Sequence, residues 1–433
     1  MNRPATINQT DNGNSYKLYK FTGIGFITAG FVLFAALLAG VVSLDAMIAS
    51  SAMFGSITVG SFLYFYGKIF SHKAGVNNAG IWLSGLTARG IAGWVLGVVI
   101  TGFYVLLYWY PTTLNGLISI MNPLAYTITG KPADQWFLYG TFYTFAILIM
   151  GFRAIFRYRH NRYQIFRTAV IMLAQLIFAY LIPSFLKAMH QPEFYFSYFW
   201  PLKPEYLFPS NVAVFQSKGA VGQFMVFWGV MMSFVAVPAL TYYFGKRWYC
   251  SWVCGCGGLA NTLGDPWRQL SDKSLRAWKF ERWSIHLVLV SITIITIMLW
   301  INSYTEGKIF GKASGIMAKA YGFYIGALFS GIIGVGFYPI LGTRVWCRFG
   351  CPQAAILGII QKFFSRFRIT TNGGQCISCG NCSTYCEMGI DVRAYAQKGQ
   401  NIVRASCVGC GVCSMVCPRG VLKLENGPVK GRV

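Results

Sequence analysis

The sequence predicts an all-α polytopic membrane protein of about eight transmembrane helices, with a small α+β domain at its C-terminus. Of its 433 residues, 55% are hydrophobic and 17% aromatic, whereas only 11% are charged. The mean hydropathy of +0.49 lies far above that of a soluble domain. Most of the chain is therefore expected in lipid, and a dense group of cysteines near the C-terminus marks the separate small domain.

Eight apolar stretches predict the membrane spans, because a helix needs about 20 residues to cross the ~30 Å core of a bilayer. They cover residues 21–43, 48–67, 88–110, 136–156, 165–186, 222–244, 284–302 and 320–341. The first stretch is too long for the core of a signal peptide, so we expect it to be retained. We expect an N-terminal membrane domain of about five helices over 1–221, a three-helix core over 222–352 and the small domain over 353–433.

The basic residues predict the orientation of these helices. The chain has 37 Lys and Arg against 12 Asp and Glu, and most of the basic residues fall at the N-terminus, after even-numbered spans and in the C-terminal domain. Basic loops stay in the cytoplasm, so we expect a multi-pass protein of the bacterial inner membrane whose N-terminus and C-terminal domain are cytoplasmic. The net charge of +25 then reflects topology and attraction to membrane lipid, and it does not indicate nucleic-acid binding.

Two runs of four cysteines dominate the C-terminal domain: Cys376-x2-Cys379-x2-Cys382-x3-Cys386 and Cys407-x2-Cys410-x2-Cys413-x3-Cys417-Pro418. This spacing is typical of cubane iron–sulfur clusters, and in two-cluster ferredoxins the fourth cysteine of each run ligates the other cluster. We therefore expect a ferredoxin-like domain with two [4Fe-4S] clusters, one held by Cys376, Cys379, Cys382 and Cys417 and the other by Cys407, Cys410, Cys413 and Cys386. Zinc sites and disulfide frameworks fit this spacing and setting less well.

A shorter cysteine motif occurs twice, at the ends of spans six and eight: Gly245-Lys246-Arg247-Trp248-Tyr249-Cys250-x3-Cys254 and Gly342-Thr343-Arg344-Val345-Trp346-Cys347-x3-Cys351. The i, i+4 spacing predicts that the two thiols of each copy share one helix face. Two interpretations stay open: these four cysteines hold an additional cluster, or each copy forms a redox-active dithiol. Ordinary buried cysteines are a third interpretation, which the repetition disfavours. Cys256 adds another thiol to the first copy.

Residues 222–433 resemble the membrane-bound polyferredoxins of the quinol-dehydrogenase type. This family includes the membrane subunit of periplasmic nitrate reduction, the membrane protein required for nitrous oxide reduction and the accessory protein of cbb3-type oxidase assembly. The resemblance rests on paired C-x3-C-P motifs followed by two cluster runs. Cys347, Cys351 and Pro352 match the motif in full, whereas Gly255 replaces the proline of the first copy.

The resemblance implies an electron-transfer subunit of an oxidoreductase complex, similar to a quinol dehydrogenase. Such a subunit passes electrons between the quinone pool and a respiratory reductase system, with bound quinone and other redox subunits as partners. The alternative implied by the oxidase relative is a membrane assembly or maturation factor that reduces a metal or a thiol for a respiratory oxidase. The S/T-G-A-T-type sequence that carries covalent FMN in the nitrous oxide relative is absent, so we expect no FMN.

The four histidines limit the remaining cofactors. His72 and His160 fall in predicted cytoplasmic segments and His190 in an outside loop, so we expect no transmembrane haem. His286 lies inside a predicted span and is the candidate catalytic residue of a quinol site, because imidazole can accept a proton near neutral pH. A histidine hydrogen-bonded within the bundle is the plainer interpretation. The aromatic segment 194–200 is expected to form an interfacial belt or a docking surface.

Overall fold

The computed structural model describes residues 13–39, 41, 45–71, 89–245, 247–364 and 366–426. Within these residues, eight helices are long and apolar enough to cross a membrane, which confirms the predicted polytopic architecture. These spans cover Ser15–Leu37, Ala46–Ile69, Ile91–Trp109, Gln135–Arg157, Arg162–Ala188, Ala220–Phe244, Leu275–Tyr304 and Ala313–Gly336. The predicted position of His72 lies outside the described residues.

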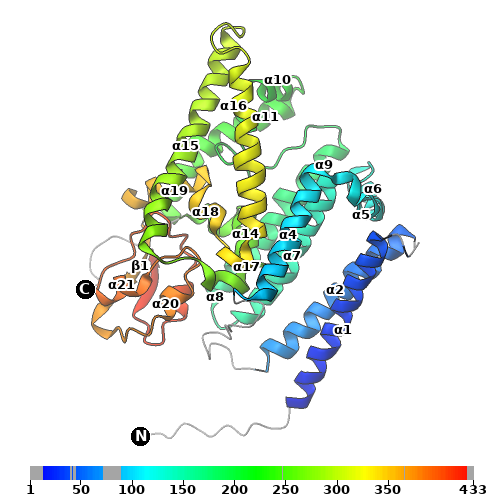
Figure 1. Cartoon of the computed structure of the whole chain (residues 1–433). Coiled ribbons are helices and arrows are strands. Elements are labelled where there is room, and N and C mark those ends of the chain that lie inside the picture. Colours follow the sequence, from blue (N-terminus) through cyan, green and yellow to red (C-terminus); the bar gives the residue numbers. More distant parts are fainter. Residues whose placement is uncertain are drawn as a thin grey trace, which may run out of the picture.

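Several spans combine an α-helix with a π-helical segment. The α-helices of the spans are α1 (Gly13–Leu38), α2 (Ala46–Ile69), α4 (Ile91–Trp109), α7 (Gln135–Arg157), α8 (Arg162–Leu176) with α9 (Ile182–Ala188), α11 (Ala220–Met231) with α12 (Val237–Phe244), α15 (Leu275–Tyr304) and α16 (Ala313–Tyr321). The π-helical segments are Ile177–Leu181, Met232–Ala236 and Gly322–Gly336. Figure 1 shows α1 and α2 as a hairpin beside the other spans.

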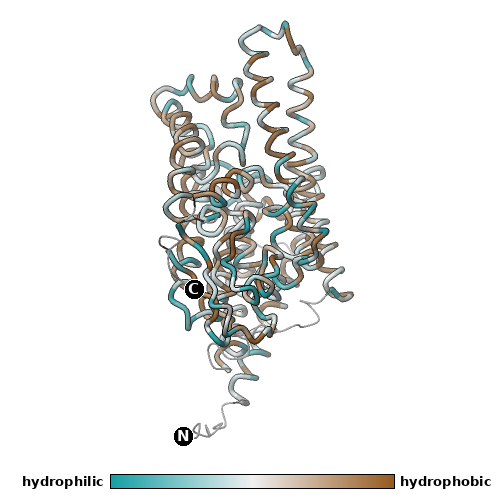
Figure 2. Tube along the Cα trace, turned by 90° about the vertical axis from the view of Figure 1, so that its left-hand side faces the viewer, coloured by the Kyte–Doolittle hydropathy of each residue, from teal (hydrophilic) through white to brown (hydrophobic). Residues whose placement is uncertain are grey.

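The surface of the spans is apolar, as a membrane-embedded surface must be. Large side chains such as Val98, Phe227 and Leu287 are more than half exposed in the isolated chain. Hydrophobic residues predominate along the long helices in Figure 2. Helical backbone satisfies its own hydrogen bonds, so only the side chains of these spans need to suit the lipid.

Short helices connect the spans at the end away from the C-terminal domain, which we call the distal end. They are α5 (Asn115–Ile120), α6 (Asn122–Thr129) and α10 (Pro209–Gln216), with 3-10 turns at Pro111–Leu114 and Pro204–Leu207. At the other end, the span that begins with Arg162 starts beside the C-terminal domain, because the Gln164 side chain donates to the carbonyl oxygen of Cys410.

The chain from α11 to α19 contains two copies of one structural unit. In each copy a span with a π-helical segment leads to a short helix that starts with proline at its second position, then to a glycine and two further helices. The first copy comprises α12, Gly245, α13 (Trp248–Trp252) and α14 (Gly255–Asn261), and the second comprises α17 (Tyr338–Leu341), Gly342, α18 (Val345–Phe349) and α19 (Pro352–Phe364). Gly245 has φ 60° and ψ −177°, and Gly342 has φ 88° and ψ 176°. This region is almost restricted to glycine, so the repeat extends to the backbone of its turn.

The prediction that the two thiols of each motif copy share a helix face is wrong. α13 ends at Trp252 and Cys254 is an extended residue that precedes α14. α18 ends at Phe349, and Cys351 lies between α18 and α19. In the second copy the reason is Pro352, because proline disfavours helical backbone at the residue before it. Each pair of cysteines therefore flanks a break between two helices.

The C-terminal domain is a small α+β unit, as predicted. Strands β1 (Phe367–Thr371) and β2 (Leu422–Asn426) pair antiparallel, with Phe367 opposite Asn426. Between them lie α20 (Asn381–Thr384), α21 (Val392–Gln397) and α22 (Val412–Met415), and 3-10 turns occur at Gly373–Gln375 and, before the domain, at Asp265–Leu270. β1 precedes the first cysteine run and β2 follows the second. The pairing of these two strands therefore holds both runs in one domain (Figure 1).

Candidate iron–sulfur centres

Four cysteines of the C-terminal domain surround one cavity. Cys376, Cys379, Cys382 and Cys417 line it, and we call these residues the exposed group. Cys379 is exposed and Cys382 is buried, so the cavity reaches from the interior to the surface of the domain. The structure thus brings together three cysteines of the first run and the last cysteine of the second run.

The other four cysteines of the runs form an inner group: Cys386, Cys407, Cys410 and Cys413. Burial raises the pKa of the Cys386 thiol to about 12, and the neighbouring thiols of Cys410 and Cys407 add to this shift. Burial also raises the pKa of Cys413, beside the same three thiols. Cys386 therefore lies among the cysteines of the second run, as the crossed ligand pattern requires.

The exposed group surrounds a cavity with four cysteines. Four thiolates are the ligand set of a cubane cluster. Among the described residues, no three His, Cys, Asp or Glu side chains converge closely enough to hold a single metal ion.

The remaining five cysteines lie together, four of them buried and Cys256 half-buried, and we call this group the pentad: Cys250, Cys254, Cys256, Cys347 and Cys351. The four cysteines of the repeated motif are at most 5% exposed. They belong to one apolar core that also contains thiols of the inner group. A hydrogen bond with the Cys256 thiol lowers the pKa of Cys254 to about 7, although burial opposes this shift. Burial raises the pKa of the Cys250 thiol.

The arginine of each motif copy reaches into the other copy. Arg247 Nη1 donates to the carbonyl oxygen of Cys347 at 2.8 Å, and Arg344 Nη1 donates to the carbonyl oxygen of Cys250 at 3.2 Å. Arg344 Nη1 also lies 3.6 Å from the Cys347 sulfur. This reciprocal pair of contacts joins the two copies around the pentad.

Arg247 also attaches the C-terminal domain to the pentad. Its Nε donates to the carbonyl oxygen of Ala405 at 2.8 Å, and its backbone N–H donates to that of Cys407 at 3.3 Å. The side-chain amide of Gln164, on α8, donates to the carbonyl oxygen of Cys410 at 2.6 Å. The loop that carries the inner group is therefore fixed directly to the membrane helices.

A buried ion-pair network provides a second attachment. Glu387 is 0% exposed and accepts from Arg344 at 2.9 Å, with Arg268 at 3.5 Å from its other oxygen. Arg268 pairs with Asp265 at 2.9 Å, and Asp265 pairs with Arg153 at the end of α7 at 3.0 Å. The network runs from the first cysteine run, past the pentad, to the fourth span.

The buried charges around the pentad have an excess of arginine. Five arginines are at most 2% exposed, namely Arg167, Arg247, Arg268, Arg344 and Arg348, and the buried carboxylates are Asp265, Glu281 and Glu387. Arg344 Nε and Arg268 Nη1 have no hydrogen-bond partner among the described residues. A buried cation is costly unless a negative group compensates it. Clusters ligated by four thiolates carry negative charge, so the residues present fit such a group.

The first motif copy enters the bundle at the middle of the spans. A Cβ atom at Gly255 would lie 3.0 Å from Gln175 Oε1 and 2.2 Å from the hydroxyl oxygen of Tyr198. Gln175 lies at the centre of the span Arg162–Ala188 and donates to Thr144 of α7 at 3.1 Å. The part of the pentad around Gly255 therefore lies at the level of the middle of this span.

The aromatic segment 194–200 is not an exposed belt, contrary to the prediction. Phe194 is 1% exposed and Phe199 is 0% exposed. Phe199 packs on Tyr249, next to Cys250, with ring centroids 5.1 Å apart. The Tyr249 hydroxyl also donates to the carbonyl oxygen of Ser197, so the segment packs against the first motif copy.

His286, the candidate quinol residue, is half-buried on α15. Arg247 is the charged side chain within electrostatic range of its imidazole. The neighbouring Trp283 is 73% exposed and so faces the lipid. The structure thus places His286 on α15 between the buried Ile285 and the lipid-facing side of the helix, on the side of Arg247.

Three functional features escaped sequence reasoning. Glu387 directly follows the first run, where the second run has Pro418, and forms the ion pair with Arg344. The arginine at the same position in both motif copies signalled a shared role, but only the structure shows the crossed contacts. Tyr198 lies in a loop far from the cysteines in sequence, and no motif marks its contact with Gly255.

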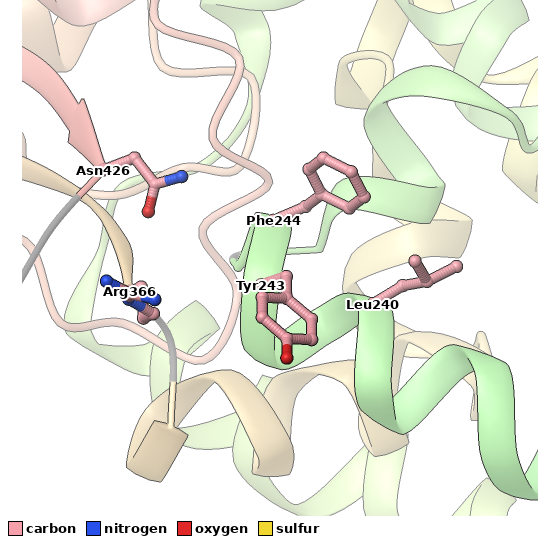
Figure 3. Close-up of a pocket in the computed structure, with 5 residues that line it drawn as sticks. All are labelled: Leu240, Tyr243, Phe244, Arg366 and Asn426. Carbon is pink, nitrogen blue, oxygen red and sulfur yellow. The ribbon is translucent and has the colours of Figure 1, made fainter.

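A wide pocket of about 490 Å³ lies where the spans meet the C-terminal domain. Leu240, Tyr243 and Phe244 of α12 form its apolar side, whereas Arg366 directly precedes β1 and Asn426 ends β2 (Figure 3). An apolar wall facing a basic and an amide side chain is typical of a membrane–water interface.

Comparison with known proteins identifies the cysteine-bearing parts. Residues 375–422 match the 4Fe-4S dicluster domain family, and residues 226–278 and 323–370 each match the 4Fe-4S binding domain family. The second family therefore matches both copies of the structural repeat. No solved structure matches the chain.

Three curated relatives are similar to parts of the chain. A putative electron transport protein, YccM, of Escherichia coli is 26% identical over 173 residues, which is 38% of this chain and 46% of that protein. The uncharacterized protein MJ0749 of Methanocaldococcus jannaschii is 25% identical, covering 34% of this chain and 53% of that protein. The methylamine utilization ferredoxin-type protein MauN of Methylobacillus flagellatus is 24% identical, and the match covers 35% of this chain and 52% of that protein. The chain spans about half the length of these relatives.

Motif spacing, family matches and geometry agree on the chemistry of these centres. The chain carries ferredoxin-type 4Fe-4S-binding domains, joined to eight helices that are long and apolar enough to cross a membrane.

Proposed function

We propose that the chain is an integral-membrane iron–sulfur electron-transfer protein that passes electrons between the quinone pool and a respiratory reductase system. The observation that supports it most is the attachment of the inner group to the pentad through Arg247 and the pair Arg344–Glu387. A ferredoxin domain that exchanged electrons only with soluble partners would not need buried contacts with the membrane helices.

The three cysteine groups form a series from the surface into the bundle. The exposed group opens to solvent at Cys379, the inner group is fixed to Arg247, and the pentad lies at the level of Gln175. Bound clusters supply one-electron transfer. The protein contributes thiolate ligands, excludes water from the inner positions and compensates negative charge with buried arginines.

Within the pentad, Cys250, Cys254, Cys347 and Cys351 are our candidates for the ligands of a further cluster. Each repeat copy supplies two thiols, and the buried Arg344 lies close enough to Cys250, Cys254 and Cys347 to act on their charge. Cys256 has no counterpart in the second copy, where Gln353 follows Pro352. A pair of dithiols would not require the two copies to meet, whereas a shared cluster does.

The setting follows from charge and from the pocket at the domain junction. We infer a location in the bacterial inner membrane with the C-terminal domain in the cytoplasm, since basic loops stay inside. Arg366, above the apolar residues of α12, then lies at the level of the lipid head groups. The exposed group faces the cytoplasm and is the position at which another redox subunit would dock.

His286 is our candidate for a proton acceptor in quinol oxidation on this side of the bundle. We expect replacement of His286 by alanine to slow quinol-dependent cluster reduction while leaving reduction by dithionite unchanged. A rate equal to that of the wild type would remove His286 from the mechanism.

Iron and sulfide analysis of anaerobically purified protein, with EPR of the reduced state, tests the proposed centres. We expect the wild type to contain three cubane clusters and the Cys347→Ser variant to lose one of them. Cys256→Ser is the matched control in the same pentad and should retain all three. Two clusters in the wild type, unchanged by Cys347→Ser, would show that the pentad holds none.

A further inference from the structure

The exposed group differs from the inner group in the apolar residue that accompanies its cysteines. Each cysteine run has an apolar residue directly after its first cysteine, Ile377 in the first run and Val408 in the second. Val408 is 2% exposed, whereas Ile377 is 55% exposed. The same position of the same motif is therefore turned to the core in one run and to solvent in the other.

The loop that presents Ile377 is anchored within the C-terminal domain. The next residue, Ser378, has φ 58°, and the second run has Gly409 with φ 66° at this position. Positive φ is uncommon for a residue other than glycine. The Ser378 hydroxyl accepts a hydrogen bond from the Gln397 side chain of α21 at 2.8 Å. The exposed Ile377 therefore belongs to a surface that α21 holds in place.

Two arginines stand at the rim of the cavity of the exposed group. Arg393 of α21 and Arg419, directly after Pro418, line this cavity, and both side chains are exposed. Among the described residues, no carboxylate lines it. Asp391, two residues before Arg393, is the N-cap of α21 and accepts from the Ser383 hydroxyl at 2.7 Å. The rim of the cavity is therefore basic.

An apolar centre within a polar or charged rim is the usual composition of a protein–protein interface. Here the centre is Ile377 beside the exposed Cys379, and the rim is positively charged. A partner of opposite charge is attracted before contact, which raises its association rate. Such a partner is guided to the cysteine group that opens to solvent.

We propose that this surface, formed by Ile377, Cys379, Arg393 and Arg419, docks a soluble redox protein that is acidic around its own one-electron centre. A single electron passes between the exposed group's cluster and the partner's centre, so that one is oxidised as the other is reduced, and no covalent bond forms or breaks. This inference rests on the proposed function and names the chemistry of the partner that meets the C-terminal domain.

Stopped-flow oxidation of the reduced protein, freed of dithionite, tests the surface in nanodiscs of phosphatidylcholine, which has no net charge. The probes are two small haem proteins of opposite charge, the acidic soluble domain of cytochrome b5 and the basic cytochrome c. We expect Arg393→Gln/Arg419→Gln to react with cytochrome b5 roughly tenfold more slowly than the wild type at low salt. The two rates should converge at 1 M salt, where the Debye length is about 3 Å. The reaction of this variant with cytochrome c should not slow.

Three further variants separate charge from structure. Arg393→Lys/Arg419→Lys keeps the charge and should keep the wild-type rate. Arg276→Gln/Lys279→Gln removes two exposed basic side chains from the start of α15 and is the matched control for net charge. Ile377→Ser keeps both arginines and should slow the reaction with cytochrome b5 at low and high salt alike. EPR of each reduced protein before mixing confirms that its clusters are present.

Equal slowing by the control pair, or a glutamine variant that reacts with cytochrome b5 as fast as the wild type, would overturn the surface. A loss of rate confined to nanodiscs with phosphatidylglycerol would also overturn it, because the arginines would then bind anionic lipid. Reaction of the same clusters with quinone is measured separately. Reaction with quinone but no preference for the acidic probe contradicts only the docking surface, whereas that preference without any reaction with quinone supports the surface and contradicts the proposed function.

Discussion

At the scale of single residues, three buried carboxylates form ion pairs with arginines, and each pair joins two segments that are far apart in the sequence. Glu387 joins the C-terminal domain to the second motif copy, and Glu281 of α15 pairs with Arg348 at 2.7 Å. Asp265 joins the first motif copy to α7. Removing one partner of a buried pair leaves an uncompensated charge, so these residues should dominate the stability of the junctions.

Glu387→Gln should lower the free energy of unfolding by about 3–5 kcal/mol, because Arg344 would remain buried without its carboxylate and Arg268 would keep only Asp265. Unfolding of the purified protein in detergent measures this effect. Glu306→Gln removes an exposed carboxylate 4.0 Å from Lys308 and is the matched control. Equal losses in both variants would contradict a structural role of the buried pair.

The Asp265 carboxylate should stabilise the protein at neutral pH but not in acid. Burial alone would raise the pKa of Asp265, but the guanidinium groups of Arg157, Arg268 and Arg153 outweigh it and hold the pKa well below its ordinary value. A depressed pKa contributes stability above the unfolded value of about 4, and this contribution is lost as the pH falls. Melting of wild type and Asp265→Asn between pH 7 and 4 should show a difference that is constant above about pH 5 and shrinks below it. A difference that grows in acid would refute this assignment.

At the scale of elements, the central feature is the repeated unit that breaks its helix between two cysteines. The positive φ of Gly245 and Gly342 turns the chain after the span, and the break brings the thiols of both copies to one place. The sequence alone indicated the repeat, because the same residue motif occurs at the ends of spans six and eight. It could not reveal the helix breaks, because an i, i+4 spacing is equally consistent with a continuous helix.

Gly342→Ala should lower the free energy of unfolding by about 1–3 kcal/mol, the cost of a non-glycine residue in this backbone region. A Cβ there would also lie 2.7 Å from the backbone nitrogen of Ser271. Gly315→Ala is the control inside α16, where nothing lies within 4 Å, and it should be neutral or stabilising. Thermal melts of both variants check this, and a Gly342→Ala protein as stable as the wild type would contradict it.

The elements that are determined by a local pattern of residues could be predicted directly from the sequence. Apolar runs of about 20 residues predicted the eight spans, and cysteine spacing predicted the family of the C-terminal domain. The contacts of Glu387 and Tyr198 did not follow, because each depends on packing between segments far apart in the chain. The inward turn of segment 194–200 escaped prediction for the same reason, since an aromatic run suits both an interface and a core.

At the scale of the whole molecule, cysteine side chains extend from the C-terminal domain to the middle of the span Arg162–Ala188. The first copy of the repeat carries its cysteines to the level of Gln175, and aromatic residues continue toward the distal end through Tyr198 and Tyr195. The N-terminal spans contribute to this arrangement, because Gln175 of α8, which is hydrogen-bonded to Thr144 of α7, lies beside Gly255 of the first motif copy.

The central claim is that the pentad connects the membrane quinone to the ferredoxin-type domain. Its most direct test is freeze-quench EPR of dithionite-reduced protein in nanodiscs that contain a long-chain quinone, which is confined to the lipid. We expect the quinone to oxidise the clusters of the wild type and of Cys256→Ser at the same rate, and those of Cys347→Ser about tenfold more slowly or not at all. Equal rates in all three proteins would contradict the claim, because electrons would then reach the quinone without the pentad.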